Sequence, residues 1–230
     1  MCNMLDFHLH LARLPHAEEL KKALERENYR YICIACEPWE WEKVQKMEEE
    51  SAAYGIHPTI AAEVSEADFE VLEGIIQQKK DASVGECGLD KRYPGYGEGE
   101  IQEQVFLRQV RLAVKYGRDL QIHCVGDYGR ILKLLKAASY PPRNFETVPK
   151  PIFHRFGGDA GLVRGALSLG AIFSLHADSF RKKSTAAAIL QIPEANIRFE
   201  TDADETTFKN ESVDEIVASL VSRLKSIQGL

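Results

Sequence analysis

The sequence predicts a (β/α)8 barrel of the TIM type, slightly shorter than most. Short apolar runs alternate strictly with longer amphipathic stretches, eight of each, which favours a parallel sheet whose strands are connected by helices. The length of 230 residues falls in the range of barrels that fold as one domain. No stretch rich in Pro, Gly or Ser divides the sequence, so we expect a single domain over residues 1–230. A doubly wound open sheet is the alternative.

The expected elements follow one another along the chain. The strands are the apolar runs at 4–9, 30–35, 52–56, 82–85, 119–123, 151–153, 171–175 and 197–200. The helices are the amphipathic stretches at 16–27, 39–50, 65–78, 98–116, 126–138, 159–169, 180–190 and 212–227. Ser65 with Asp68, and Ser212 with Glu215, have the spacing of a capping box, so each serine is expected to begin a helix.

Composition and charge exclude several classes of protein. With 29 basic and 35 acidic residues the net charge is −6, and no block of like charges indicates general electrostatic binding of nucleic acid. No apolar run is long enough to span a membrane, and the first residues lack the features of a secretory signal. Five irregularly spaced cysteines indicate a reducing compartment, so we expect a cytoplasmic protein. The isolated pair Cys33 and Cys36 is expected to be buried, with redox chemistry as the alternative.

Histidines and carboxylates gather at the ends of the expected strands. Alternate residues of a strand share a face, so Asp6, His8 and His10 lie on one side of the first strand. Five further residues end or follow later strands: His57, Glu86, His123, His154 and Asp202. Barrel enzymes carry their active sites at the C-terminal ends of the strands. A lone histidine there is usually only a polar residue, but this group predicts a metal site.

These residue types indicate a hydrolase with two metal ions. Imidazole and carboxylate groups suit zinc, manganese and similar divalent cations. A carboxylate between two groups of imidazoles can bridge a metal pair, which polarises a phosphoryl or carbonyl oxygen and lowers the pKa of bound water towards ~7. Asp202 could then accept the proton of that water.

Six local strings spread along almost the whole chain resemble one family. They are D-F-H-L-H at 6–10, Y-G-I-H-P at 54–58, V-G-E-C-G-L-D at 84–90, Q-I-H-C at 121–124, F-H-R-F-G-G at 153–158 and E-T-D-A at 200–203. In this order they resemble the TatD-type metal-dependent deoxyribonucleases of the amidohydrolase superfamily. The resemblance implies a barrel that holds two divalent metal ions, Zn, Mn or Mg, and hydrolyses phosphodiester bonds in DNA.

The resemblance also implies roles for individual residues at the first metal. His8 and His10 would bind that metal, with Asp202 contributing on the same side. Glu86 would bridge the two metals. Asp202 and Glu86 are therefore the expected catalytic residues.

The resemblance also implies roles at the second metal for residues in other strings. His123 and His154 would complete the second metal site. His57 is expected in the wall of the active site or in contact with substrate, rather than on a metal. Asp90 and Glu200 are expected to orient the metal ligands.

The sequence departs from the family pattern at the substrate rim. Lys91 and Arg92 follow G-L-D where aromatic residues are usual, and Arg155 stands where a small or thiol residue is usual. We expect Arg92 and Arg155, together with His57, to bind substrate, and Arg155 to bind its phosphate.

Other residues near the rim leave alternatives open. The basic run at 181–183 is either an ordinary solvated surface or part of a DNA contact, and His176 is expected at the rim rather than on a metal. The expected substrate is DNA or a small phosphodiester, bound weakly and in a metal-dependent manner. The alternatives are a metal-dependent hydrolase of a small non-nucleotide ester, amide or lactone, and a non-catalytic metal-binding protein.

Overall fold

Strands and helices alternate along the chain in a computed structural model that describes residues 4–97, 99–142 and 145–229. Eight parallel strands form one sheet in sequential order, and each pairs with the next. The strands are β1 (Leu5–Leu9), β2 (Arg30–Ala35), β3 (Ala52–Tyr54), β4 (Ser83–Asp90), β5 (Leu120–Val125), β6 (Pro151–Phe153), β7 (Ile172–Leu175) and β8 (Ile197–Phe199).

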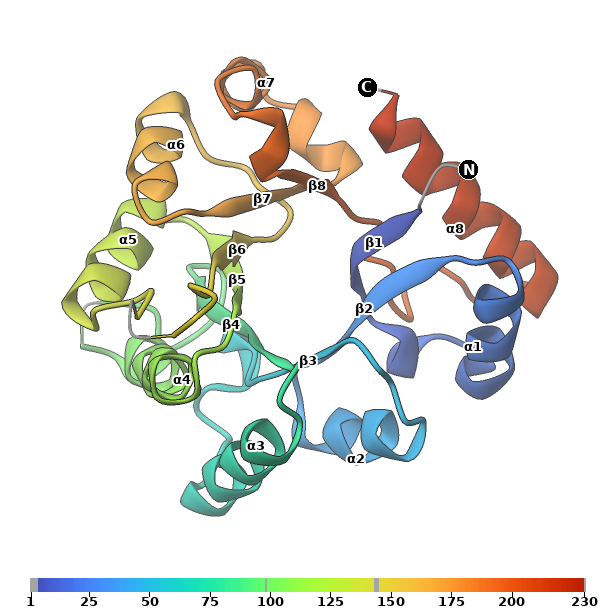
Figure 1. Cartoon of the computed structure of the whole chain (residues 1–230), viewed down its shortest axis with the longest axis horizontal. Coiled ribbons are helices and arrows are strands. Elements are labelled where there is room, and N and C mark those ends of the chain that lie inside the picture. Colours follow the sequence, from blue (N-terminus) through green and yellow to red (C-terminus); the bar gives the residue numbers. More distant parts are fainter. Residues whose placement is uncertain (1–3, 98, 143–144, 230) are drawn as a thin grey trace.

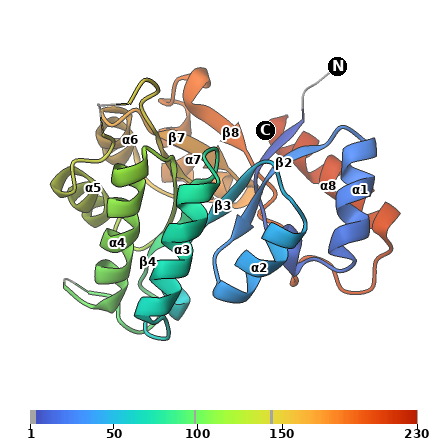
Figure 2. The same ribbon diagram turned by 60° about the horizontal axis from the view of Figure 1, so that its bottom comes forward.

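The helices form an outer layer around the ring of strands (Figure 1). They are α1 (Ala17–Arg26), α2 (Pro38–Lys46), α3 (Glu66–Gln78), α4 (Ile101–Tyr116), α5 (Tyr128–Ala137), α6 (Ala160–Leu167), α7 (Lys183–Ile189) and α8 (Val213–Gln228). Four short 3-10 helices lie in the loops: η1 (Leu11–Arg13), η2 (Pro58–Ile60), η3 (Ala177–Phe180) and η4 (Glu194–Asn196). Neighbours in sequence are neighbours in space, as α3 and α4 show (Figure 2). The predicted (β/α)8 barrel is confirmed, and the open sheet is excluded.

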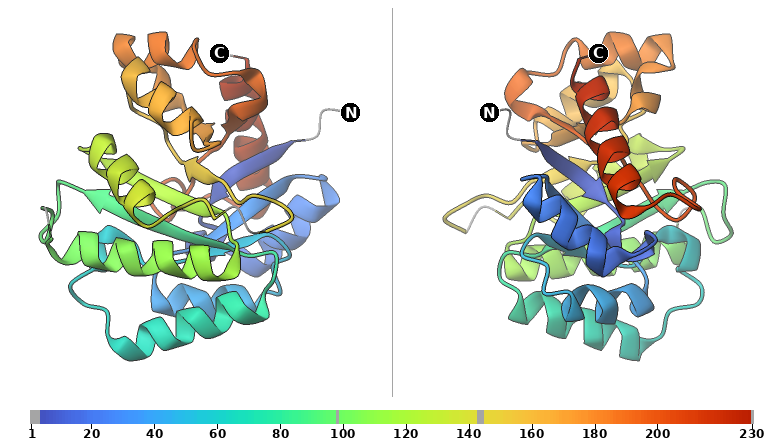
Figure 3. Two further views of the ribbon diagram at one scale, coloured as in Figure 1. Left: turned by 60° about the vertical axis from the view of Figure 1, so that its left-hand side comes forward. Right: turned by 90° about the vertical axis from the view of Figure 1, so that its right-hand side faces the viewer.

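The ring closes between the first and last strands. The segment after β8 pairs with the end of β1: Asp202 N donates to His8 O at 3.0 Å, and His10 N donates to Ala203 O at 3.0 Å. The buried carboxylate of Asp6 accepts hydrogen bonds from the backbone N–H of Thr201 at 2.9 Å and from its hydroxyl at 2.5 Å. Outside this junction α8 lies beside α1 (Figures 1 and 3). Closure therefore fixes the loop that carries Asp202 against β1.

The fourth strand is longer than predicted. The expected strand at 82–85 ended before Glu86, whereas β4 continues to Asp90, so Glu86 lies inside the strand. Gly88 pairs with His123 at φ 155°, and a Cβ at Gly88 would come within 1.9 Å of the carbonyl oxygen of His123. The glycine therefore allows a close approach of β4 and β5 instead of ending the strand.

The two predicted capping boxes are confirmed, whereas the helices expected from 98 and from 180 begin three residues later, at Ile101 and Lys183. Ser65 and Ser212 form capping boxes at the starts of α3 and α8, as expected. The helix expected at 180–190 begins only at Lys183, because η3 occupies the preceding residues. The His176 side chain accepts a hydrogen bond from Asp178 N and thereby starts η3.

The apolar side chains form a core between the strands and the surrounding helices. Trp41, Phe106, Phe153 and Phe173 are among the largest fully buried side chains. Cys33 and Cys36 are buried as expected, and the four cysteines in the described part of the chain are all free. Among the described residues, no helix combines the length and the apolar character needed to cross a membrane.

Candidate metal centre

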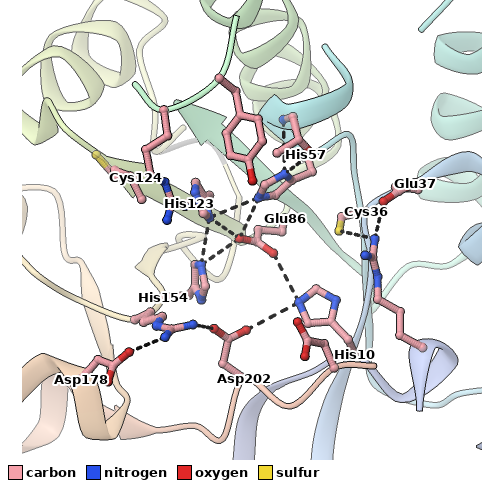
Figure 4. Close-up of a pocket in the computed structure, with 17 residues that line it drawn as sticks. His10, Cys36, Glu37, His57, Glu86, His123, Cys124, His154, Asp178 and Asp202 are labelled. Carbon is pink, nitrogen blue, oxygen red and sulfur yellow. Dashed lines mark hydrogen bonds and ion pairs between the residues drawn. The ribbon is translucent and has the colours of Figure 1, made fainter. Parts of the chain in front are cut away.

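A pocket of about 620 Å³ opens at the C-terminal ends of the strands (Figure 4). The predicted residues that line it are His10, His57, Arg92, Glu86, His123, His154, Arg155 and Asp202. His8 lies beneath them and is fully buried. The barrel thus brings together the metal-ligand candidates predicted from six different strands or strand ends.

One oxygen of Glu86 faces the histidines of β1. Glu86 Oε2 lies 3.2 Å from His8 Nε2 and 3.5 Å from His10 Nε2. The same two nitrogens lie 3.9 and 3.6 Å from Oδ1 of Asp202. His8, His10 and Glu86 thus offer ligand atoms within 4.8 Å of one another, and Asp202 lies beside the two histidines.

The other oxygen of Glu86 faces a second group of imidazoles. Glu86 Oε1 lies 2.6 Å from His123 Nδ1, 2.8 Å from His154 Nε2 and 3.6 Å from His57 Nε2. Within this group His123 Nδ1 lies 3.3 Å from His57 Nε2 and 3.2 Å from His154 Nε2. The structure therefore places His57 among the potential ligands, closer to Glu86 than a role in the pocket wall alone would require.

The spacing of these atoms fits bound divalent cations. Around a tetrahedral zinc with bonds of about 2.0–2.1 Å, neighbouring ligand atoms lie about 3.3 Å apart. The nitrogen–nitrogen distances of 3.2 and 3.3 Å in the second group match that spacing. His57, Glu86 and His123 can offer ligand atoms within 4.8 Å of one another, and so can His8, His10 and Glu86. Glu86 contributes to both sets, as a bridging carboxylate would.

Carboxylates behind the histidines fix the orientation of two rings. Asp90 Oδ2 lies 3.0 Å from His123 Nε2, which leaves Nδ1 pointing at Glu86. Arg92 donates to both oxygens of Asp90, at 2.9 Å from Nε and 2.6 Å from Nη2. His154 Nδ1 lies 3.3 Å from Glu200 Oε1. Such partners hold metal-binding imidazoles in place, as expected for Asp90 and Glu200.

The electrostatic environment keeps the central carboxylates ionised. Burial acts to raise the pKa of Glu86, but the surrounding imidazoles of His154, His57 and His8 hold this pKa well below its usual range. Burial likewise opposes ionisation of Asp202, yet the hydrogen bond with His10 and the nearby histidines lower its pKa. Two buried anions surrounded by imidazoles make a strong site for cations.

The predicted substrate-binding arginines lie at the mouth of the pocket. Arg155 Nη1 donates to Asp202 Oδ2 at 2.7 Å, and its Nη2 donates to Asp178. The side chain of Arg155 is 45% exposed and that of Arg92 is 60% exposed, so both remain accessible to a substrate.

Two other rim residues have structural partners. His176 lies at the start of η3, where its pKa is lowered by burial and by the charge of Arg155, and it does not line the pocket. Arg130, which follows β5, forms an ion pair with Glu103 of α4. Neither residue belongs to the groups around Glu86.

One cluster beside His10 was not predicted. Arg13 donates to Glu40 at 2.7 Å and to Glu37 at 2.6 Å, and its Nη2 lies 3.8 Å from the sulfur of Cys36. Glu40 is fully buried and also accepts a hydrogen bond from Cys36 N at 2.8 Å. In the sequence Glu40 has the pattern of an ordinary charge near a helix start, so only the fold reveals that it anchors Arg13 at the pocket.

The fold and the site together define a metal-dependent hydrolase of the barrel class. The profile of the family described as TatD related DNase matches residues 5–228. The chain therefore belongs to the TatD family, as its local strings predicted, and the expected enzyme class, a metal-dependent hydrolase, is confirmed.

The alignments with similar proteins cover different shares of those proteins. Human deoxyribonuclease TATDN3 is 25% identical over an alignment of 249 residues, which covers 97% of this chain and 88% of the relative. The Mycobacterium tuberculosis protein named uncharacterized metal-dependent hydrolase TatD is 31% identical over 162 residues, 68% of this chain and 59% of the relative. The 3'-5' ssDNA/RNA exonuclease TatD of Klebsiella pneumoniae is 28% identical over 152 residues, 65% of this chain and 55% of the relative.

Solved structures share the fold over nearly the whole chain. The TatD homologue YJJV of Escherichia coli K12 has a TM-score of 0.74 at 20% identity. The match covers 98% of this chain and 98% of that one. A TatD family hydrolase of Entamoeba histolytica has a TM-score of 0.71 at 17% identity, covering 99% of this chain and 92% of that one. These likenesses support the barrel fold.

Proposed function

We propose that this chain is a divalent-metal-dependent phosphodiesterase whose substrate is DNA or a small phosphodiester. The observation that carries the proposal is Glu86, whose two oxygens each face a separate group of imidazoles in a pocket at the mouth of the barrel. The names of the human relative, a deoxyribonuclease, and of the Klebsiella relative, a ssDNA/RNA exonuclease, support a nucleic-acid substrate.

The proposed ligands divide between two cations. His8, His10 and Asp202 would hold the first cation, and Glu86 would contribute a carboxylate oxygen to each site. His123 and His154 complete the second site, and His57 is close enough to join them. Because imidazole predominates, zinc or manganese fits better than magnesium, which prefers oxygen ligands and water. Divalent cations held there supply Lewis-acid polarisation of the phosphoryl oxygen and of the attacking water.

Asp202 and Arg155 form an ion pair, and each has a separate proposed role toward the substrate. Asp202 is ionised, so its carboxylate can accept the proton of the attacking water. Arg155 uses one N–H group for Asp202 and another for Asp178, whereas a guanidinium has five. Because the side chain lines the pocket and is 45% exposed, its remaining N–H groups are available to bind a phosphate oxygen.

Three guanidinium groups at the pocket favour a phosphodiester over a neutral ester, amide or lactone. Arg13, Arg92 and Arg155 all line the pocket around the buried carboxylates. Guanidinium groups suit phosphate because they donate in a planar, bidentate geometry. A phosphodiester therefore fits the mouth of this pocket better than an uncharged substrate does.

The test compares substrates on protein loaded with zinc, manganese or magnesium. We expect cleavage of labelled single-stranded DNA or of a bis-aryl phosphate, and no comparable turnover of a panel of carboxylic esters and lactones. The Asp202→Asn variant serves as the control for contaminating nucleases. Turnover of esters but never of phosphodiesters would favour the alternative hydrolase, and metal binding without any turnover would favour a non-catalytic protein.

The proposal also covers the cellular location of the protein and the domain that carries the activity. A reducing, cytoplasmic location is supported by the free, buried cysteines Cys33, Cys36, Cys87 and Cys124. We assign the activity to one domain over residues 1–230, because the ligands come from strands that span the barrel from β1 to the segment after β8.

A further inference from the structure

Arg13 connects the turn after β1 to α2 at the wall of the pocket. Its Nε donates to Glu40 Oε1 at 2.7 Å and its Nη2 to Glu40 Oε2 at 3.1 Å, while Nη2 also donates to Glu37 at 2.6 Å. Two parallel bonds to one carboxylate fix the direction of a guanidinium as well as its distance. We call Arg13 together with Glu40 the arginine clamp.

The arginine clamp is buried between this turn and α2. The side chain of Glu40 is 0% exposed and that of Arg13 is 17% exposed. Glu40 also accepts a hydrogen bond from Cys36 N at 2.8 Å, just after β2. Lys43 of α2 donates to the carbonyl of Ala12 at 2.5 Å, so α2 holds the turn at two points. Exposed ion pairs contribute little to stability, but a buried carboxylate depends on its partners, so the clamp is a fixed part of the fold.

The turn that the arginine clamp holds begins at His10. Arg13 N donates to the carbonyl of His10 at 2.9 Å, which forms the turn η1, and His10 N donates to Ala203 O at 3.0 Å. His10 lies on the same side of the pocket as Cys36 and Glu37 (Figure 4). The backbone of His10 is therefore fixed on one side by the clamp and on the other by closure of the barrel.

The arginine clamp also reaches the loop that carries Asp202. Arg13 Nη1 lies 3.5 Å from Oε1 of Glu205, three residues after Asp202. The partners of the clamp thus lie in the segments after β1, β2 and β8, which carry His10 and Asp202. The other imidazoles that face Glu86 belong to β3, β5 and β6 or to their ends, and they are His57, His123 and His154.

The imidazole rings of β1 lack the support that His123 has. Nδ1 of His8 and Nδ1 of His10 are buried, and neither has a hydrogen-bond partner among the described residues. By contrast, the outer nitrogen of His123 lies 3.0 Å from Asp90. A metal-binding histidine usually donates from its second ring nitrogen to a carboxylate, a carbonyl or water, which orients the ring. Within the protein, the placement of His10 therefore depends on the backbone turn that the clamp holds.

We propose that Arg13 and Glu40 are positioning residues that hold His10 in place for the first cation, and that they set the affinity of this site separately from that of the second. This inference rests on the proposed two-cation centre and deepens it, because it gives the two sites different supports. Arg13 acts through His10 and does not need to contact the substrate. Loss of the arginine clamp should therefore weaken one cation site and spare the other.

The test uses the double variant Arg13→Met/Glu40→Gln. Replacing Arg13 alone would leave a buried carboxylate without its partner, which destabilises a fold, whereas the double variant removes both charges. The glutamine can still accept the hydrogen bond from Cys36 N.

The chain offers a matched control in Arg130→Met/Glu103→Gln. Arg130 donates from Nε and Nη2 to the two oxygens of Glu103, which is buried, so the geometry is the same as in the arginine clamp. This pair also joins neighbouring units of the barrel, but neither residue lines the pocket. The control therefore reports what the loss of such a pair does to the fold alone.

Cation binding is measured directly, without turnover. Metal-free protein is titrated with Zn²⁺ in competition with a chromogenic chelator, which gives the number of bound cations and the Kd of each. Electron paramagnetic resonance with Mn²⁺ then distinguishes a coupled pair of ions from an isolated ion. Urea unfolding of the metal-free proteins shows whether the fold is retained, and turnover of a bis-aryl phosphate is followed across a range of metal concentrations.

We expect the unmodified protein and the control to bind two cations. The clamp variant should raise the Kd of one cation by about 10–100-fold and leave the other Kd unchanged. At a Mn²⁺ concentration that gives the coupled spectrum in the control, the clamp variant should give the spectrum of an isolated ion. Its turnover should be lost at low metal concentration and restored by excess metal, with KM unchanged.

Other outcomes overturn the inference. Equal weakening of both sites would show a general structural role, and so would two unchanged Kd values beside a loss of stability. Unchanged Kd values with a KM that stays raised in excess metal would place Arg13 on the substrate instead. Uptake of fewer than two cations by the unmodified protein would also contradict it. If two cations bind but no phosphodiester is cleaved, the proposed function fails, and the Kd values alone decide the role of the arginine clamp.

Discussion

Arg155 and Asp202 form an ion pair of 2.7 Å between Nη1 and Oδ2, which joins the loop after β6 to the loop after β8. The other carboxylate oxygen of Asp202 lies 3.6 Å from His10 Nε2. Asp202 is thus held between a candidate metal ligand and a guanidinium at the mouth of the pocket. The proton acceptor and the proposed phosphate-binding group are therefore positioned by each other.

Replacing Arg155 tests its role in binding phosphate. We expect Arg155→Lys to lose about tenfold in kcat/KM on phosphodiesters and Arg155→Ala about a hundredfold, because a hydrogen bond to a charged group contributes about 1.5–3 kcal/mol. Steady-state kinetics on a bis-aryl phosphate give these values. An unchanged kcat/KM in the alanine variant would show that Arg155 does not contribute to binding the phosphate.

Variants of the two carboxylates should separate proton transfer from metal binding. We expect Asp202→Asn to lower kcat by about 10²–10⁴-fold, because the amide cannot accept a proton from water. Glu86→Gln should lower the metal content more than Asp202→Asn does, since Glu86 faces both groups of imidazoles whereas Asp202 lies beside His8 and His10. Elemental analysis beside kinetics checks both, and normal turnover by Asp202→Asn would remove this residue as the proton acceptor.

Removal of metal should abolish hydrolysis and lower stability. A cation present at 100 times its Kd stabilises the folded state by about 2.7 kcal/mol, which corresponds to about 5–10 °C in Tm for a chain of this size. We expect chelation to lower Tm by that amount and zinc or manganese to restore it. The Glu86→Gln variant is the control, because its Tm should respond little. A protein whose activity and Tm are both insensitive to EDTA would contradict the two-metal proposal.

Glu49 should make stability depend on pH. Burial raises the pKa of Glu49, and the nearby Glu25 and Glu50 add to this effect, whereas Lys21 and Tyr31 oppose it. The folded-state pKa lies above the unfolded-state value, so the contribution of this group is most favourable at low pH and is lost as pH rises through the folded-state pKa.

A Glu49→Gln variant should not lose this stability as pH rises, because its side chain has no proton to release. Its amide oxygen can still accept the hydrogen bond from Tyr31, which measures 3.1 Å in this structure. We therefore expect the variant to be more stable than the unmodified protein at pH 7, with the difference shrinking towards about pH 4. Urea unfolding across this pH range measures it, and the neighbouring exposed Glu50→Gln is the control. A difference that does not change with pH would refute the interpretation.

The capping box of α3 should contribute measurably to stability. Ser65 accepts from Asp68 N, and Ser65 N donates to Asp68 at 2.7 Å. We expect Ser65→Ala to lower the free energy of unfolding by about 1 kcal/mol, or about 2–4 °C in Tm. Ser222→Ala, at an exposed position inside α8, should be neutral or slightly stabilising, because alanine favours helix. Equal effects of the two changes would show that the cap contributes nothing.

Periodicity and residue type predicted the barrel because both signals are local. Apolar runs marked all eight strands, and the strand ends carried the histidines that the structure brings together around Glu86. Glu86 was predicted at the end of its strand, whereas it lies inside β4. The close approach of β4 to β5 that makes Gly88 favourable depends on the partner strand, which no local pattern reveals.

Residues whose roles depend on contacts between loops were harder to predict. Arg13 reaches Glu37 and Glu40 of the next unit of the barrel, and these positions have no special spacing in the sequence. The position of the loop after β6 likewise depends on hydrogen bonds of Gly157 with Tyr128 and Thr185. Such contacts follow from how neighbouring loops pack once the barrel has closed.

The junction between β1 and the segment after β8 links the site to the order of synthesis. His8 and His10 leave the ribosome early, whereas Asp202 and Ala203, which pair with them, follow the last of the eight strands. A nascent chain that lacks this segment has neither a closed barrel nor a complete set of ligands. The proposed hydrolytic activity therefore requires that synthesis has passed Ala203, and a nascent chain that carries only the histidines is not expected to cleave nearby nucleic acid.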